Sequence, residues 1–200
     1  MRERPTLDCA TLPLHGSGSQ SLSWWGNLGY MLIEGSGMAL AIAVYFYLQS
    51  IAPQWPLGAA PPRLGPGTAM AVLLVLSLLP NHFMLKWAKA HELRKVRLGL
   101  IFFCVLGVAL LVLRVLEFQA LNVSWDSNAY GSAVWLLMGL HTAHLVTDII
   151  EWFVLCGLMF SRHGDNKRRF GDVQDNTLYW AFVVVAWLAV YGCVYWIPRA

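Results

Sequence analysis

The stretch that decides the fold is GSAVWLLMGLHTAHLVTDIIEWFVLCGLMF, residues Gly131 to Phe160. It is thirty residues long and apolar at most positions. A helix needs about 20 consecutive, mainly apolar residues to cross the hydrocarbon core of a bilayer. A run of this length therefore predicts a membrane-spanning helix rather than a buried helix of a soluble domain.

Outside this stretch the sequence contains further apolar runs, and the chain is 58% apolar and 12% charged overall. These values favour bilayer over water as the solvent, and they exclude nucleic-acid binding, intrinsic disorder and a secreted disulfide scaffold. We predict an all-α integral membrane protein: a polar cytoplasmic segment over 1–23, then one transmembrane domain over 24–200. The five predicted spans are 24–48, 67–85, 98–117, 131–160 and 177–197.

The distribution of basic residues predicts the orientation. Eleven of the fourteen Lys and Arg residues lie in the N-terminal segment, in Lys86 to Arg97 and in Arg162 to Arg169, which are alternate connections. By the positive-inside rule these segments face the cytoplasm and the C-terminus faces the periplasm. The two basic loops either serve only this topology or also bind anionic lipid headgroups.

Apart from the deciding stretch, two of the predicted spans carry charges, which are costly inside a membrane. Glu34 lies about 15 Å from the cytoplasmic end of the first span, near the middle of the bilayer. It is either a protonatable functional carboxyl or a structural group bonded to a neighbouring helix. Arg114 and Glu117 are three residues apart on one helix face, so we predict that they form an ion pair.

The deciding stretch itself carries four polar residues with helical spacing: His141, His144, Asp148 and Glu151. Their steps of three, four and three place them within an arc of about 80°. Such a stripe is too costly to face lipid, so it must face protein, water or a metal. The simplest interpretation is that both histidines form hydrogen bonds to neighbouring helices.

These four residues are also the candidates for a metal site, because imidazole and carboxylate groups suit iron, manganese or zinc. A two-iron centre in a helical bundle would require Glu-x-x-His sets on different helices, and this pattern is incomplete. We therefore predict no metal site. The motifs of nucleophilic and phosphate chemistry, such as G-x-S-x-G and a glycine-rich phosphate loop, do not occur, so we predict no catalytic centre.

Four ordered motifs resemble subunit III of the haem–copper cytochrome c oxidases. Residues 130–132 (YGS) followed by 139–144 (GLHTAH) are similar to the family's Y-G-S and G-F-H-G-x-H. Glu34, within residues 32–34 (LIE), resembles the Glu of the S-E motif in the family's first shared helix. Glu117 with Phe118 resembles the family's E-Y motif. Residues 179–183 (YWAFV) with Trp187 are similar to its Y-W-H-F-V-D-x-x-W. The resemblance covers about 24–196, except for the proline-rich loop around 51–66.

The resemblance implies a short, five-helix, non-catalytic subunit III of a haem–copper terminal oxidase in a bacterial cytoplasmic membrane. It implies that haem and copper are held by the catalytic subunit I and by subunit II, while this chain binds neither and holds phospholipid. It also implies that the chain stabilises the catalytic subunit and supports proton uptake. Glu34, Glu117, His141 and His144 would then be structural or proton-linked residues.

The sequence departs from the family's motifs at the last helix. Ala181 replaces a His, Val184 replaces an Asp, and Gln174 stands at a family Glu. Arg114, Asp148 and Glu151 are additional charges, so we hypothesise that the fourth-span stripe contacts Arg114 or Glu117 in one buried network. Because of these departures, a second interpretation stays open, namely that the chain is an accessory subunit III-like protein of a nitric oxide reductase. A stand-alone metal-binding or proton-coupled protein is a further alternative.

Overall fold

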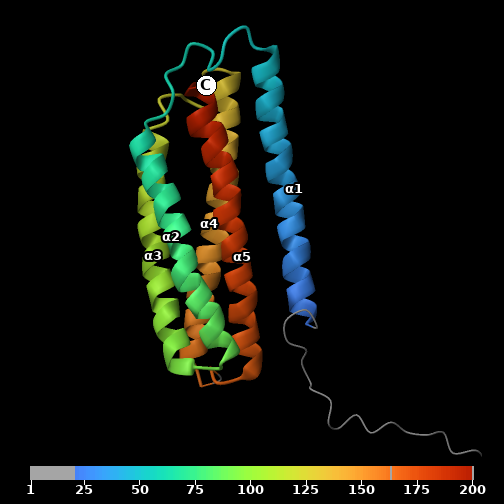
Figure 1. Ribbon diagram of the computed structural model, residues 1–200, viewed down its shortest axis with the longest axis vertical. Coiled ribbons are helices and arrows are strands. Elements are labelled where there is room, and N and C mark those ends of the chain that lie inside the picture. The colour runs from blue at the N-terminus through green and yellow to red at the C-terminus, as the bar shows by residue number, and fades with distance from the viewer. Residues whose placement is uncertain (1–20, 163, 200) are drawn as a thin grey trace, which may run out of the picture.

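The computed structural model describes residues 21–162 and 164–199, and within them it contains helices and no strand (Figure 1). The long helices are α1 (Leu22–Ile51), α2 (Leu64–Lys89), α3 (Leu93–Gln119), α4 (Ala129–Phe160) and α5 (Lys167–Tyr191). The last helix continues through a π-helical turn, Gly192–Trp196, and a 3₁₀ turn, Ile197–Arg199. All five are long and apolar enough to cross a membrane, so the chain is a multi-pass membrane protein.

The predicted all-α fold with five spans is confirmed, and the helices extend beyond the predicted spans. The largest extension is in α5, which begins ten residues before the predicted span at residue 177. The added segment is polar and contains Lys167, Arg168 and Arg169, so hydropathy alone could not include it. Most of the predicted polar segment 1–23 lies outside the described residues.

Polar side chains cap three of the helix starts. The Ser21 hydroxyl accepts a hydrogen bond from the Trp24 amide at 3.0 Å, at the start of α1. The Asn128 side chain accepts one from the Gly131 amide at 2.8 Å, at the start of α4. Asn166 does the same for the Arg168 amide at 3.0 Å. Each cap satisfies an amide that has no partner within its helix.

The five helices run alternately up and down, so all the connections lie at two ends (Figure 1). We call the end with the tight 90–92 and 161–166 turns the basic end, because most of the Lys and Arg residues of the described chain flank these turns. The opposite end carries the loops 52–63 and 120–128 and is called the loop end. The assignment of the two ends to the two sides of the membrane stays a prediction.

Helix α5 packs against α1, α2 and α4, while α3 packs between α2 and α4. Helix α1 lies at the edge of the bundle, where it packs mainly on α4 and α5 (Figure 1). Aromatic residues fill the core, where the rings of Phe103 and Trp152 stack at 4.5 Å and Trp180 packs edge-on against Phe103 at 5.8 Å. This packing fixes the interior faces that carry the polar residues.

One glycine permits a close approach on which the polar interior depends. A Cβ atom added to Gly67 of α2 would lie only 2.3 Å from Cζ of Tyr195. Any larger residue would therefore displace the Tyr195 ring, whose hydroxyl donates a hydrogen bond to Glu117. The absence of a side chain at Gly67 lets α2 pack over this contact.

Candidate functional site

Arg114 and Glu117 form the predicted ion pair at the loop end of α3. The guanidinium Nη1 lies 2.9 Å from the Glu117 carboxylate Oε2. The side chains are 2% and 0% exposed, so the pair is shielded from both lipid and water. The prediction that these two residues pair is confirmed. A buried pair of this kind neutralises two charges that would each be costly in the membrane.

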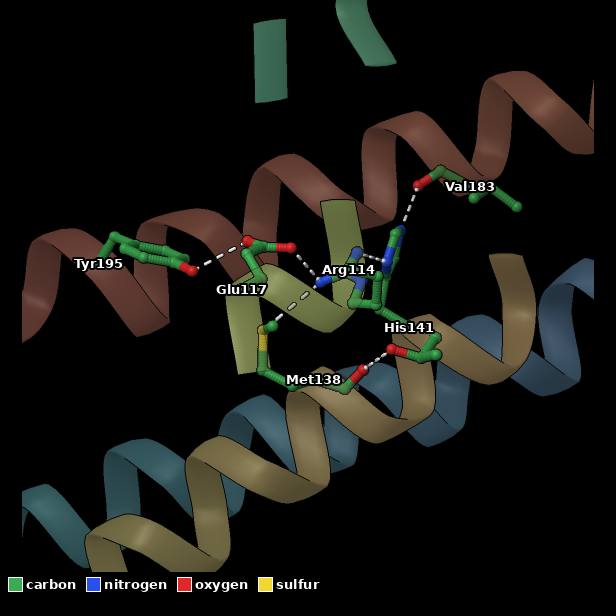
Figure 2. Close-up of polar contacts among 7 residues, drawn as sticks. Arg114, Glu117, Met138, His141, Val183 and Tyr195 are labelled. Atoms are coloured by element: carbon green, nitrogen blue, oxygen red, sulfur yellow. Dashed lines mark hydrogen bonds and ion pairs between the residues drawn. The ribbon is translucent and has the colours of Figure 1, made fainter. Parts of the chain in front are cut away.

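Arg114 also contacts His141 of α4, as Figure 2 shows. The distance from Nη2 of Arg114 to Nδ1 of His141 is 2.8 Å. Because a guanidinium can only donate, Nδ1 is the acceptor and the ring proton lies on Nε2. Nε2 in turn donates to the Val183 carbonyl of α5 at 3.1 Å. His141 is thus held as a neutral imidazole between α3 and α5.

Two further contacts complete what we call the Arg114 cluster, which consists of Arg114, Glu117, His141 and Tyr195. The Tyr195 hydroxyl donates to the second Glu117 oxygen, Oε1, at 2.9 Å. The guanidinium carbon of Arg114 lies 4.2 Å from the centre of the Trp187 ring, a cation–π geometry. The cluster joins α3, α4 and the final turns of the chain, and its formal charges cancel.

Glu34 of α1 lies in a second group, the Glu34 cluster, formed with His144 and Tyr179. The Tyr179 hydroxyl donates to Oε2 of Glu34 at 2.7 Å. Nε2 of His144 lies 3.8 Å from Oε1, which is too long for a direct hydrogen bond but within range of an ion pair when the ring is protonated. A carboxyl, an imidazole and a phenol therefore converge near the middle of the three helices α1, α4 and α5.

Asp148 lies deeper in the bundle and makes different contacts. Its two carboxyl oxygens accept hydrogen bonds from Trp152 Nε1 and from Asn176 Nδ2, both at 2.9 Å. The residue is completely buried. Within residues 21–162 and 164–199, no Lys, Arg or His side chain lies at ion-pair distance from it. Hydrogen bonds, not an opposite charge, are what satisfy this carboxyl.

Glu151, the last residue of the stripe, is exposed on the surface of the chain. It borders a pocket near the basic end together with Asp172 and Asp175 of α5 and Ser23 and Asn27 of α1. Ser23 donates to the Asp175 carboxylate at 2.9 Å, and Arg169 pairs with Asp172 at 3.1 Å. These carboxylates therefore lie where the helices leave the apolar core.

The hypothesis that the whole stripe joins Arg114 or Glu117 in one network is wrong. Of its four residues, His141 contacts Arg114, whereas His144, Asp148 and Glu151 belong to the separate sites described above. The reason is geometric: ten residues of α4 rise about 15 Å, so each residue of the stripe meets its neighbours at a different depth. The four residues lie on one face of α4 but belong to different sites.

The separation of these four side chains also matters for whether they could bind a metal ion together. No group of three or more His, Cys, Asp or Glu side chains within the described part of the chain is arranged to hold a metal ion. Both ring nitrogens of His141 are already hydrogen-bonded, so binding a metal there would break two bonds. His144, Asp148 and Glu151 do not converge on a common point.

Two partners of these clusters, Tyr195 and Asn176, were not predicted as site residues from the sequence. Tyr179 and Val183 were quoted there only as part of a motif. All four belong to the last helix or its final turns, and their contacts depend on the register of this segment against α3 and α4. Of the three departures from the family motifs, Val184 is buried in the core. Ala181 and Gln174 line a groove between α1, α2 and α5.

The fold and these contacts define a class: an all-helical, multi-pass membrane protein whose interior carries buried, hydrogen-bonded and paired ionisable groups. The sequence pattern of the family "Cytochrome c oxidase subunit III" matches residues 14–198, which is nearly the whole chain. The chain therefore belongs to the cytochrome c oxidase subunit III family. This confirms the resemblance drawn from the motifs.

Individual relatives agree with this assignment. The chain is 29% identical over 157 residues to cytochrome c oxidase subunit 3 of Artemia franciscana, covering 76% of this chain and 60% of the relative. It is 27% identical over 181 residues to the same subunit of Yarrowia lipolytica, covering 85% and 67%. It is 30% identical over 161 residues to the same subunit of Dugong dugon, covering 76% of this chain and 60% of the relative. The matched region thus spans about 60–67% of the length of these relatives.

Proposed function

We propose that this chain is a non-catalytic subunit III of a haem–copper terminal oxidase, which stabilises the catalytic subunit and supports proton uptake for oxygen reduction. The observation that carries the proposal is the set of buried ionisable groups in a chain of the subunit III family. Ionisable residues inside a membrane are costly and usually mark proton relays or helix contacts. In this proposal, subunits I and II hold the haem and copper.

The orientation is part of this proposal, and the charges at the two ends support it. We place the basic end in the cytoplasm and the C-terminus in the periplasm of a bacterial cytoplasmic membrane. The support is that the positive-inside rule applies to short loops, and the 90–92 and 161–166 turns are short and flanked by nine Lys and Arg residues. The two longer loops of the described chain, at the loop end, carry one basic residue, Arg63.

The two clusters have different roles in this proposal. The Arg114 cluster is structural, because its charges cancel and its histidine is held by hydrogen bonds on both nitrogens. The Glu34 cluster is proton-linked in this proposal, because an imidazole and a carboxyl 3.8 Å apart form an ion pair when the ring takes up a proton. It lies between the edge helix α1 and helices α4 and α5, and in this proposal a partner subunit packs on α1.

The test measures oxygen uptake by membranes in which the gene is deleted and then restored. We expect the native chain to restore uptake. The variant Glu34→Gln should assemble with normal haem content but reach roughly half the rate or less, because the group that exchanges protons is gone. The control is Glu92→Gln, which removes a carboxylate at the basic end that pairs with Lys95 at the surface.

Equal rates for the native chain and Glu34→Gln, at equal haem content, would contradict the proton-linked role. Unchanged oxygen uptake on deletion, together with a loss of nitric oxide reduction, would instead support the accessory protein of a nitric oxide reductase. The departures at Ala181 and Val184 are the observation that favours this second candidate.

A further inference from the structure

A pocket of about 400 Å³ lies between α1, α2 and α5 near the basic end. Its lining includes Trp24 of α1, Asn81 and Lys89 of α2, and Ala181 of α5. Pockets of this volume are typical of binding sites for small molecules. None of its lining residues belongs to the Arg114 cluster or the Glu34 cluster, so the proposed function leaves this pocket without a role.

Asn81 is the group that points to a ligand. Its side chain lines the pocket and is only 6% exposed. Nδ2 donates to the Thr177 carbonyl of α5 at 2.9 Å, and because a carbonyl can only accept, the orientation of the amide is fixed. Oδ1 has no hydrogen-bond partner within residues 21–162 and 164–199. A buried acceptor without a partner is costly, so a group with an O–H or N–H belongs beside it.

The space near Asn81 results from one of the departures at the last helix. Ala181 lies one turn after Thr177 on α5, and Asn81 is bonded to the Thr177 carbonyl. The family motif has a histidine in place of Ala181, whereas the alanine side chain ends at Cβ. The free space therefore lies about one helical turn from the bond that holds Asn81. It has room for a ring, and the unpaired oxygen requires a donor on that ring.

The depth of Asn81 argues against a lipid headgroup as this donor. Lys89 is the last residue of α2 and Trp24 lies in the first turn of α1, at the level where basic and aromatic side chains meet the headgroups. Asn81 lies eight residues before Lys89, which is about 12 Å further into the membrane. The headgroup layer is roughly 5–8 Å thick on each side. Below it a phospholipid has ester carbonyls and acyl chains, which carry no O–H or N–H.

A second pocket of about 460 Å³ continues from the first toward the middle of the helices. On α1, Trp24 lines the first pocket and Leu28, one turn later, lines the second. On α5, Leu178 and Phe182 have the same relation. A Cβ added to Gly35 would already touch the Phe182 ring at 3.4 Å, so the glycine keeps this part wide. Its mainly apolar lining suits a hydrocarbon chain attached to the ring.

We propose that the two pockets bind a prenylated hydroquinone, the reduced form of a membrane quinone. One ring hydroxyl donates to Asn81 Oδ1, the ring fills the space at Ala181, and the prenyl chain follows Leu28 and Phe182. The reduced form is selected because its ring oxygens carry protons, whereas both oxygens of the quinone can only accept. Binding alone is assigned to this site, without electron transfer. The pockets are built from this chain alone, so the site goes beyond the proposed function.

Native mass spectrometry of the full chain in detergent micelles under argon tests the site with three probes. They are decylubiquinol, decylubiquinone, and the dimethyl ether of decylubiquinol, which keeps the ring and the tail but has no O–H. We expect one decylubiquinol per chain. The quinone and the ether should bind about tenfold more weakly, which is about 1.4 kcal/mol, because neither satisfies the buried oxygen of Asn81.

Two variants separate the hydrogen bond from the space. Asn81→Leu removes the acceptor, so it should weaken decylubiquinol about tenfold, leave the ether unchanged and thereby abolish the preference for the quinol. Ala181→Leu fills the pocket without removing a polar contact and should abolish tight binding of all three probes. Val185→Leu is the matched control, since Val185 lies one turn further along α5, is 63% exposed and lines neither pocket.

A third variant places a donor on the chain itself. Ala181→His puts an N–H into the pocket, so it should displace decylubiquinol and raise the unfolding temperature of the chain without ligand. Equal binding of decylubiquinol and its ether, or a preference for the quinol that persists in Asn81→Leu, would overturn the proposal. So would a water molecule on Asn81 Oδ1, with no ring in the pocket, in a structure determined with decylubiquinol. These measurements involve no haem, so their failure would leave the assignment as an oxidase subunit untouched.

Discussion

Replacing Arg114 with methionine is expected to lower the free energy of unfolding by about 3–5 kcal/mol, the largest effect of any single substitution considered for this chain. Methionine keeps most of the apolar volume but removes the positive charge. Glu117 is 0% exposed and would then keep a buried carboxylate whose opposite charge is gone. The hydrogen bond from Arg114 to His141 would be lost as well.

The matched control removes both charges. The double variant Arg114→Met with Glu117→Gln has no charge left in the Arg114 cluster, and the Gln oxygen can still accept the hydrogen bond from Tyr195. We expect it to be markedly more stable than the single variant, because a buried ion pair contributes little beyond mutual neutralisation. Reversible unfolding in mixed micelles, followed by tryptophan fluorescence, measures both. Equal destabilisation of the single and double variants would show that the charges are not coupled.

Replacing Asp148 with leucine is the second large effect. Leucine leaves the Trp152 indole N–H and the Asn176 amide buried without their acceptors. Each unsatisfied donor costs about 1–3 kcal/mol in soluble proteins, while hydrogen bonds between membrane helices average about 0.6 kcal/mol. We therefore expect a loss of about 2 kcal/mol in the free energy of unfolding.

Two controls separate this effect from a general loss of polarity in α4. Asp148→Asn keeps one acceptor oxygen and should cost less than Asp148→Leu. Glu151→Leu removes an exposed carboxylate of the same helix and should change the stability of the isolated chain by about 0.5 kcal/mol or less. If Glu151→Leu destabilised the chain as strongly as Asp148→Leu, the distinction between the buried and the exposed carboxyl would be wrong.

The fold could be predicted from the sequence because each helix carries its own signal. The apolar runs gave all five spans, since the length needed to cross a bilayer is set by the membrane. The ion pair of Arg114 and Glu117 was predictable for a similar reason: residues three apart on one helix are neighbours in any fold. Both predictions depend only on local geometry.

The partners of the α4 stripe could not be predicted in this way. Spacing placed His141, His144 and Asp148 on one face, but it gave no information on what faces them from α1, α3 and α5. His141 meets Arg114, His144 meets Glu34, and Asp148 meets Asn176 because the helices pack with a particular register and rotation. This register is set by side-chain packing over the whole bundle and leaves no local pattern in the sequence.

The central claim is that the chain works as a subunit of a haem–copper oxidase. Purification of the tagged chain from its native membrane in a mild detergent tests this most directly, with visible absorption spectra and mass spectrometry of the chains that purify with it. We predict stoichiometric haem and a large catalytic subunit. A colourless chain without partners, in a detergent that keeps a known oxidase of the same membrane intact, would contradict the claim.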